Sequence, residues 1–208
     1  MKGGSASTRQ ATEGRFRLST IARRPLRADA RRNREKVVAA ASSAFAEIGL
    51  EAQVEDIARR AGVGVGTVYR HFPTKEALVE ALAEQHFERL ADTVEAALEE
   101  HGNAWDVFSA AIWRAASAAA GDVAWCEIIG GRQSAGEAGS PGQQRLGAAL
   151  ATLIGRAQAA SVMREDATVQ DIKTIMCGFG HVAAAQRAGA ALDWKRYLGI
   201  ALDGLRAR

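Results

Sequence analysis

The sequence predicts an all-α protein, because apolar residues recur every three or four positions along most of the chain and no segment alternates convincingly with period two. Composition supports this prediction. Only 3 of the 208 residues are proline and 6% are aromatic, while alanine is abundant throughout, which favours helix over sheet. With 48% hydrophobic and 25% charged residues, the chain is suited to one large or two small domains with a real core.

Several classes of protein are excluded by simple features of the sequence. Two cysteines cannot form a disulfide framework, which favours the reducing cytoplasm. The chain has no run of about 18 uninterrupted apolar residues, so we expect no membrane-spanning helix. Its first residues contain no apolar h-region, which argues against a secretory signal peptide.

The net charge of +3 is distributed very unevenly. Residues 1–36 contain eleven Lys or Arg against three Asp or Glu, a net charge of +8, which leaves −5 for the remainder. A basic front end on an acidic body predicts a polyanionic partner for the N-terminal part, either nucleic acid or an anionic membrane; a merely solvated tail is the alternative. Residues 1–28 are poor in apolar groups, and we expect a largely disordered basic tail there.

Four helices are expected from residue 30 onward, each closed by glycine or proline. Their approximate ranges are 30–48, 54–61, 65–72 and 75–100. Thr74 is the expected N-cap of the fourth helix.

Further helices are expected at about 104–120, 123–129, 143–160, 169–189 and 194–205, with a glycine-rich loop at 130–142. Thr168 and Asp171 have the spacing of a capping box, and Asp193 is the expected cap of the last helix.

The second and third helices have the spacing of a helix-turn-helix, since only Gly62-Val63-Gly64 separates them. Glycine at positions 62 and 64 suits such a tight turn, because glycine tolerates positive φ.

The third helix is expected to have one buried and one exposed face. Val65, Val68 and Phe72 cluster on the first, with Tyr69 at its edge. A glycine, a hydroxyl, a guanidinium and an imidazole occupy the other, and these groups allow close approach to DNA and hydrogen bonds to phosphates or base edges. The candidate DNA-binding residues are Gly66, Thr67, Tyr69, Arg70, His71 and, in the first turn of the next helix, Lys75.

The segment 54–78 resembles the DNA-binding signature of the TetR family of bacterial transcriptional regulators. The Ala-Gly-Val turn, the Gly-Thr-x-Tyr-x-His-Phe recognition helix and the following Lys-Glu-x-Leu match in order and spacing. The sequence departs from the family at Gln53, where Thr or Ser is common, and at Gly64, where Ser is common. The resemblance implies a homodimeric repressor that binds a roughly palindromic operator and releases it when a small molecule binds the C-terminal domain.

The expected domains are therefore a basic tail (1–28), a helix-turn-helix domain (29–75) and a helical ligand-binding and dimerisation domain (76–208). By family analogy, the last two helices of each chain build a four-helix bundle; alternatively, both pack only on their own core. Apolar and flexible residues on the helices expected to enclose a ligand pocket are the candidate ligand contacts. These are Trp105, Phe108, Trp113, Trp125, Met163, Met176 and Phe179.

Other chemistries find little support in the sequence. Cys177 and His181, four residues apart, could share a metal with the distant Cys126, but two ligands do not make a site, and we expect no metal and no cofactor. Because the chain has no nucleophile elbow, phosphate-binding glycine loop or metalloprotease motif, we expect no enzyme.

Two alternatives to a DNA-binding regulator remain at this point. The first is a small-molecule-binding or catalytic helical protein with a vestigial helix-turn-helix. The second is membrane association through the tail, although the segment 15–18 is too short to form the amphipathic helix that this would need. Instead of contacting a membrane, the tail could lie in the minor groove of DNA, which is compatible with a DNA-binding regulator.

Overall fold

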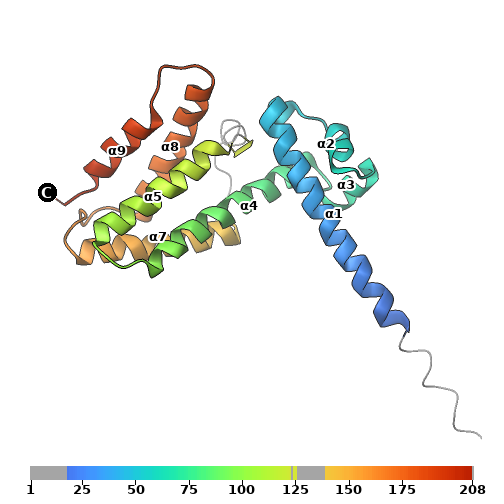
Figure 1. Ribbon diagram of the computed structural model, residues 1–208, viewed down its shortest axis with the longest axis horizontal. Helices are drawn as coiled ribbons and strands as arrows, with labels where there is room; N and C mark the ends of the chain where they lie inside the picture. Colours follow the sequence, from blue (N-terminus) through green and yellow to red (C-terminus); the bar gives the residue numbers. More distant parts are fainter. Residues whose placement is uncertain (1–17, 123, 126–138, 208) are drawn as a thin grey trace, which may run out of the picture.

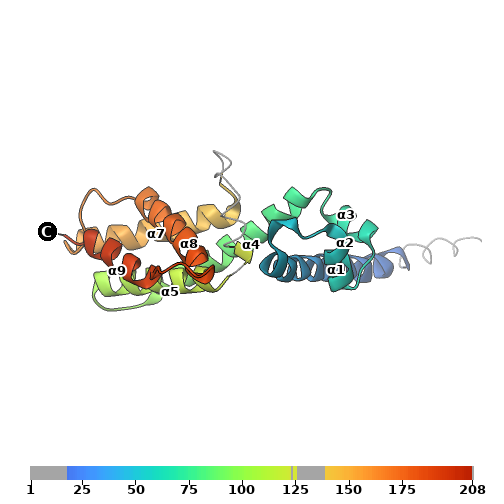
Figure 2. The same cartoon turned by 90° about the horizontal axis from the view of Figure 1, so that it is seen from above.

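The computed structural model describes residues 18–122, 124–125 and 139–207 (Figure 1). Every named element in these residues is helical, which confirms the all-α prediction. Figures 1 and 2 show two units joined by one long helix, α4 (Lys75–Ala96). The N-terminal unit comprises α1 (Leu18–Ile48), α2 (Val54–Ala61), α3 (Val65–His71) and the first half of α4. The C-terminal unit comprises the second half of α4 with α5 (Ala104–Gly121), α7 (Pro141–Ala159), α8 (Val169–Arg187) and α9 (Trp194–Gly204).

Helix α1 begins earlier than composition suggested. It starts at Leu18, so the expectation of disorder up to residue 28 is wrong for residues 18–28, while residues 1–17 lie outside the described part. The composition that we interpreted as a tail is also rich in Arg, Ala and Leu, which are among the strongest helix formers. The N-terminal half of α1 projects beyond the other helices of the N-terminal unit (Figure 1).

Helix α4 belongs to two separate hydrophobic cores. Its first turns contribute Leu78 and Leu82 to the core of the N-terminal unit, which also contains Phe45 and Ile57. Its later turns contribute Leu90 and others to the core of the C-terminal unit. A single rigid helix therefore links the packing of one unit to that of the other.

The expected helix caps are confirmed. The Thr74 side chain accepts a hydrogen bond from the Ala77 backbone N–H, and Asp193 accepts from Lys195 N–H. Thr168 and Asp171 form the expected capping box, and the Thr168 hydroxyl and backbone hold the pKa of Asp171 below its ordinary value. Helix α4 ends at Ala96, earlier than expected, because residues 97–99 tighten into a 3₁₀ turn.

The start of α7 differs from the sequence-based boundary. The helix begins at Pro141 rather than Gln143, and Ser140 and Gln143 form a second capping box. Proline suits this first helical position because its missing N–H has no intrahelical partner there in any case. Of the expected helix at 123–129, only residues 124–125 are described, and both are helical; most of the expected loop at 130–142 lies outside the described residues.

Helices α4 and α7 approach each other closely at Gly142. A Cβ at this glycine would lie 3.0 Å from the Glu88 backbone nitrogen and 3.1 Å from Phe87 Cβ. The Gly142 N–H donates to the Glu84 carboxylate at 2.8 Å, so a side chain of α4 satisfies a free amide at the start of α7.

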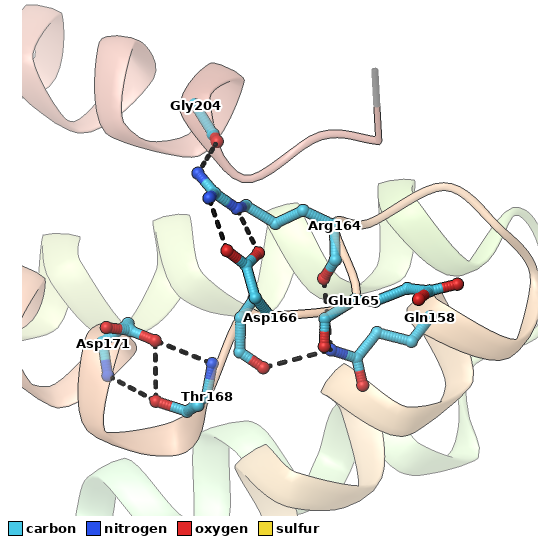
Figure 3. A network of polar contacts seen from close by, with 8 residues as sticks. Gln158, Arg164, Glu165, Asp166, Thr168, Asp171 and Gly204 are labelled. Atoms are coloured by element: carbon cyan, nitrogen blue, oxygen red, sulfur yellow. Dashed lines mark hydrogen bonds and ion pairs between the residues drawn. The ribbon is translucent and has the colours of Figure 1, made fainter.

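The connection between α7 and α8 is held by a polar network (Figure 3). Gln158 Nε2 donates to three backbone carbonyl oxygens of the connection at 3.0–3.2 Å. These belong to Arg164, Glu165 and Ala167. Arg164 forms a two-pronged ion pair with Asp166 at 2.5 and 2.7 Å. These contacts fix the position from which α8 starts.

Candidate nucleic-acid interface

The turn between α2 and α3 is set by Gly62. This residue has a left-handed conformation with φ +66°, and the following Val63 N–H bonds to the Ala58 carbonyl at 3.1 Å. That arrangement satisfies the end of α2 and turns the chain sharply. The expectation of positive φ is confirmed at Gly62 and is wrong at Gly64, which is extended (φ −71°, ψ 147°) and precedes α3 as its N-cap. An N-cap normally has an extended backbone, so glycine is not required there for conformational reasons.

The buried face of α3 matches the prediction. Val68 and Phe72 are buried in the core of the N-terminal unit, and Val65 packs against it half-buried. Arg34 of α1 adds a contact on this side, with its guanidinium 5.2 Å from the centre of the Phe72 ring. These contacts fix the rotation of α3 about its axis and so decide which residues face outward.

The outward face of α3 consists mainly of Gly66, Tyr69 and Arg70. Tyr69 is 45% exposed, which makes it one of the most exposed large apolar side chains described. Beyond Gly66 the space is open: a Cβ there would meet no atom within 4 Å. Thr67 and His71 are half-buried at the edges of this face. The structure therefore brings five of the six predicted residues to one surface.

Arg70 differs from its neighbours on α2 in being unpaired. Arg60 binds the Glu47 carboxylate with two hydrogen bonds of 2.9 and 2.7 Å and lowers the pKa of that carboxyl, and Arg59 pairs with Asp56. Within the described part of the chain, no carboxylate pairs with Arg70, which is exposed. Its charge is therefore available to a partner.

Lys75 is placed differently from the other five residues. Its ammonium group donates to the Leu50 carbonyl and lies 6.0 Å from the centre of the Phe45 ring. The side chain is half-buried and ties the start of α4 to the turn after α1. Lys75 thus has a structural role that its position in the motif did not indicate.

The predicted ligand contacts are divided between the two units. Trp105, Phe108 and Met163 are fully buried in the core of the C-terminal unit, and three others, Trp113, Met176 and Phe179, pack against it. Trp125 instead packs against the core of the N-terminal unit. None of the seven lines the surface hollow of about 370 Å³ between Leu98, Val107 and Arg156.

Cys177 and His181 are both exposed on α8. His181 Nδ1 lies 3.1 Å from the Cys177 carbonyl oxygen. Among the described residues no three His, Cys, Asp or Glu side chains are grouped so that they could hold a metal, and Cys126 lies outside that part. None of the described helices is sufficiently long and apolar to span a bilayer.

The most informative residues that sequence patterns missed are His86 and Asp122. They lie 36 positions apart, on α4 and directly after α5, and they contact each other where the two units meet. Neither residue belongs to a motif, and their contact depends on the packing of the units, so no local signal in the sequence could have identified the pair.

Two family models match the chain. Residues 37–82 match the bacterial regulatory proteins of the tetR family, and residues 101–207 match the C-terminal domain of SbtR-like transcriptional regulators. The second match alone spans about half of the 208 residues.

Individual relatives agree with the family models. A TetR transcription regulatory protein of Mycobacterium vanbaalenii is 36% identical, with 88% of this chain and 100% of that chain covered and a TM-score of 0.58. A structure described as the molecular basis for control of antibiotic production by bacterial hormones is 27% identical, covers 84% and 97%, and has a TM-score of 0.66.

Among the curated relatives, the HTH-type transcriptional repressor Rv3405c of Mycobacterium tuberculosis is 42% identical over 83 residues. The match covers 33% of this chain and 44% of that protein. The chain thus spans less than half the length of this curated relative.

These matches define the class of protein as a helix-turn-helix transcriptional regulator. The chain belongs to the TetR family, whose members bind DNA to regulate transcription and are not enzymes.

Proposed function

We propose that this protein is a ligand-responsive repressor that binds a palindromic operator as a homodimer. The observation that supports this most strongly is the outward face of α3, where an open glycine, an exposed tyrosine and an unpaired arginine lie together. Such a face suits the major groove, because a short helix with a small central residue can approach base edges closely.

Each residue of the face has a chemical role in this proposal. Arg70 reaches a guanine edge or a phosphate, and Gly66 leaves room for the DNA backbone. Thr67, Tyr69 and His71 donate hydrogen bonds to phosphates at the rim. Lys75 has further protons on its ammonium group besides the one bonded to Leu50, so it can bridge that carbonyl and a phosphate.

The proposed dimer forms through α8 and α9, which pack against each other on one side of the C-terminal unit (Figures 1 and 2). Helix α9 buries Leu198 and Leu202 inward but leaves Tyr197 42% and Ile200 56% exposed. A partner copy would cover these side chains. The outward side of α8 has the small residue Gly178, which allows close helix approach.

The dimer can be tested by replacing one exposed isoleucine in each unit. We expect Ile200→Asp to shift the protein from dimer to monomer in analytical ultracentrifugation, because a carboxylate would be buried without a partner. Ile48→Asp is the matched control, since Ile48 is 47% exposed at the end of α1, in the other unit. Equal dimerisation of both variants and the wild type would exclude the α9 interface.

Responsiveness to a small molecule is proposed for the C-terminal unit. The similar structure that is 27% identical to this chain concerns the control of antibiotic production by bacterial hormones. The ring pairs Trp105–Phe108 and Trp113–Trp194 supply aromatic surface around which a pocket can open. Because the protein would act on bacterial DNA, we place it in the cytoplasm.

Operator binding is tested by footprinting DNA around the protein's own gene at physiological salt. We expect protection of two symmetric half-sites whose centres lie one or two helical turns apart. Protection of an asymmetric site by a single protomer would contradict the homodimer, and absence of any protected site would contradict the proposal as a whole.

A further inference from the structure

His86 occupies an unusual position on α4. It lies between the turns that contribute to the N-terminal core and those that contribute to the C-terminal core, and it is only 3% exposed. It is the one fully buried polar or charged residue recorded for residues 28–122, 124–125 and 139–207. A buried imidazole at a junction between two units requires an explanation beyond packing.

Aromatic rings and one carboxylate surround His86. Its ring stacks on Trp125, with the centres 3.9 Å apart and the planes 11° from parallel. Its Nδ1 lies 3.2 Å from Asp122 Oδ2, so the neutral ring donates an N–H to this carboxylate. Its Nε2 is buried, and no hydrogen-bond partner is found for it within the described part of the chain.

Asp122 connects His86 to the end of α5. The same carboxylate accepts a 2.6 Å bond from Arg89 and, through its other oxygen, a 3.0 Å bond from the Trp125 backbone N–H. Burial would raise the pKa of Asp122, but the bonds from His86 and Trp125 and the nearby Arg89 charge hold it below its ordinary value. Asp122 is therefore an anion that organises the segment following α5.

That segment reaches into the N-terminal unit. Ala124 is 3% exposed and belongs to the core built by α1–α4, and Trp125 packs against the same core. Figure 1 shows the end of α5 approaching the N-terminal unit. Besides α4 itself, the described contact between the two units thus passes through residues tied together by His86 and Asp122.

We propose that His86, Asp122 and Trp125 form a proton-sensitive clasp between the two units, so that protonation of His86 loosens the clasp and weakens operator binding. The proposal rests on the proposed function for its effect on DNA. The clasp itself is independent of DNA.

The direction of the effect follows from the groups that face the ring. Protonation would place an N–H on the buried Nε2, for which the described residues offer no acceptor. His86 also lines a cavity of about 10 Å³, which has room for about one water. Ser42 of α1 and Gln85 of α4 line this cavity and are uncharged, whereas Arg89 and Asp122 are the charged groups that line it. Burial and the Arg89 charge lower the pKa of His86 below 6.5, outweighing the opposing effect of Asp122.

The sign of the linkage is therefore defined. The folded protein holds the proton on His86 less tightly than the unfolded chain does. The contribution of His86 to the stability of the folded state is therefore fully present above pH 6.5. It is lost as the pH falls below 6.5 and through the folded-state pKa. The clasp between the two units should therefore loosen at acidic pH.

The test begins with the full-length wild type and no DNA. The NMR signal of the His86 ring should titrate with a midpoint below pH 6.5, and tryptophan emission should change over the same range. His86→Phe keeps a flat ring against Trp125 but cannot titrate, so this emission change should disappear. His101→Gln is the matched control, because His101 is exposed on the C-terminal unit.

Operator affinity is then measured at pH 7.5 and 5.5 by fluorescence anisotropy. We expect the wild type to lose at least about fivefold more affinity on acidification than His86→Phe does. His71 at the DNA face is present in both proteins, so it cannot account for a difference between them.

Two outcomes would overturn the clasp: a wild-type His86 ring that titrates at or above pH 6.5, or an affinity whose pH dependence is the same in His86→Phe. If no operator is bound at any pH but His86 and tryptophan emission titrate as expected, the proposed function fails and the proton-sensitive contact stands.

Discussion

The two units of this protein differ in how directly their sequence reveals their function. In the N-terminal unit, the seven-residue helix α3 presents an outward face whose chemistry can be recognised residue by residue. The C-terminal unit consists of longer helices whose inward residues, such as Phe108 and Leu153, are ordinary core side chains. A surface that binds a fixed partner needs particular groups, whereas a core and a ligand pocket share the same apolar composition.

The largest effects should come from removing one buried ring from each unit. Phe45 and Phe108 are both 0% exposed. We expect Phe45→Ala and Phe108→Ala each to lower the free energy of unfolding by about 3–5 kcal/mol, measured by urea denaturation. Phe45→Ala should abolish operator binding while the dimer persists.

The two-unit comparison would be wrong if Phe45→Ala dissociated the dimer. That result would mean that the units fold only together.

A second pair of substitutions, both of glycines, separates stability from DNA binding within the N-terminal unit. Gly62→Ala should cost about 1–2 kcal/mol of stability, because an alanine would have to adopt φ +66°. Gly66→Ala meets open space in an ordinary helix, so stability should stay equal or rise by about 0.5–1 kcal/mol while operator affinity falls. Thermal unfolding and anisotropy measure the two quantities. Unchanged affinity in Gly66→Ala would remove this glycine from the DNA interface.

Smaller effects are expected from the threonine caps, one in each unit. Thr74→Ala and Thr168→Ala should each lower stability by about 1 kcal/mol in urea denaturation, since each leaves a helix N–H without its side-chain acceptor. Only Thr74→Ala should also weaken operator binding, because α4 starts beside α3. Equal DNA binding by both variants would show that the start of α4 does not position the recognition helix.

The smallest effect distinguishes the two roles of Lys75. If it bridges Leu50 and a phosphate, Lys75→Ala should reduce the slope of log affinity against log salt by about 0.9, besides a modest loss of stability. An unchanged slope with reduced stability would show that Lys75 serves only the fold.

Much of this arrangement was accessible from the sequence because it depends on neighbouring residues. The caps at Thr74, Thr168 and Asp193 and the turn at Gly62 are local events, and all four are confirmed. Those features that sequence patterns missed depend on partners far along the chain. Examples are the bond from Lys75 to Leu50 and the contact between His86 and Asp122.

The early start of α1 has a different cause. Residues 18–28 contain both the charges typical of a disordered tail and the side chains typical of a helix, so composition alone supports either state. Trp125 was assigned to a ligand pocket because of its residue type, yet it lies against the N-terminal core. Residue type indicated an apolar contact for Trp125 but could not predict which core it packs against.

The most direct test of the account is the affinity of Arg70→Ala for DNA from upstream of the protein's own gene, compared with Arg114→Ala. Both substitutions remove one exposed arginine, but Arg114 lies on α5 and pairs with Glu100. In fluorescence anisotropy at physiological salt, we expect Arg70→Ala to lose about 1–3 kcal/mol of binding free energy. Arg114→Ala should match the wild type. Equal affinity of the two variants would contradict the assignment of the outward face of α3 to DNA.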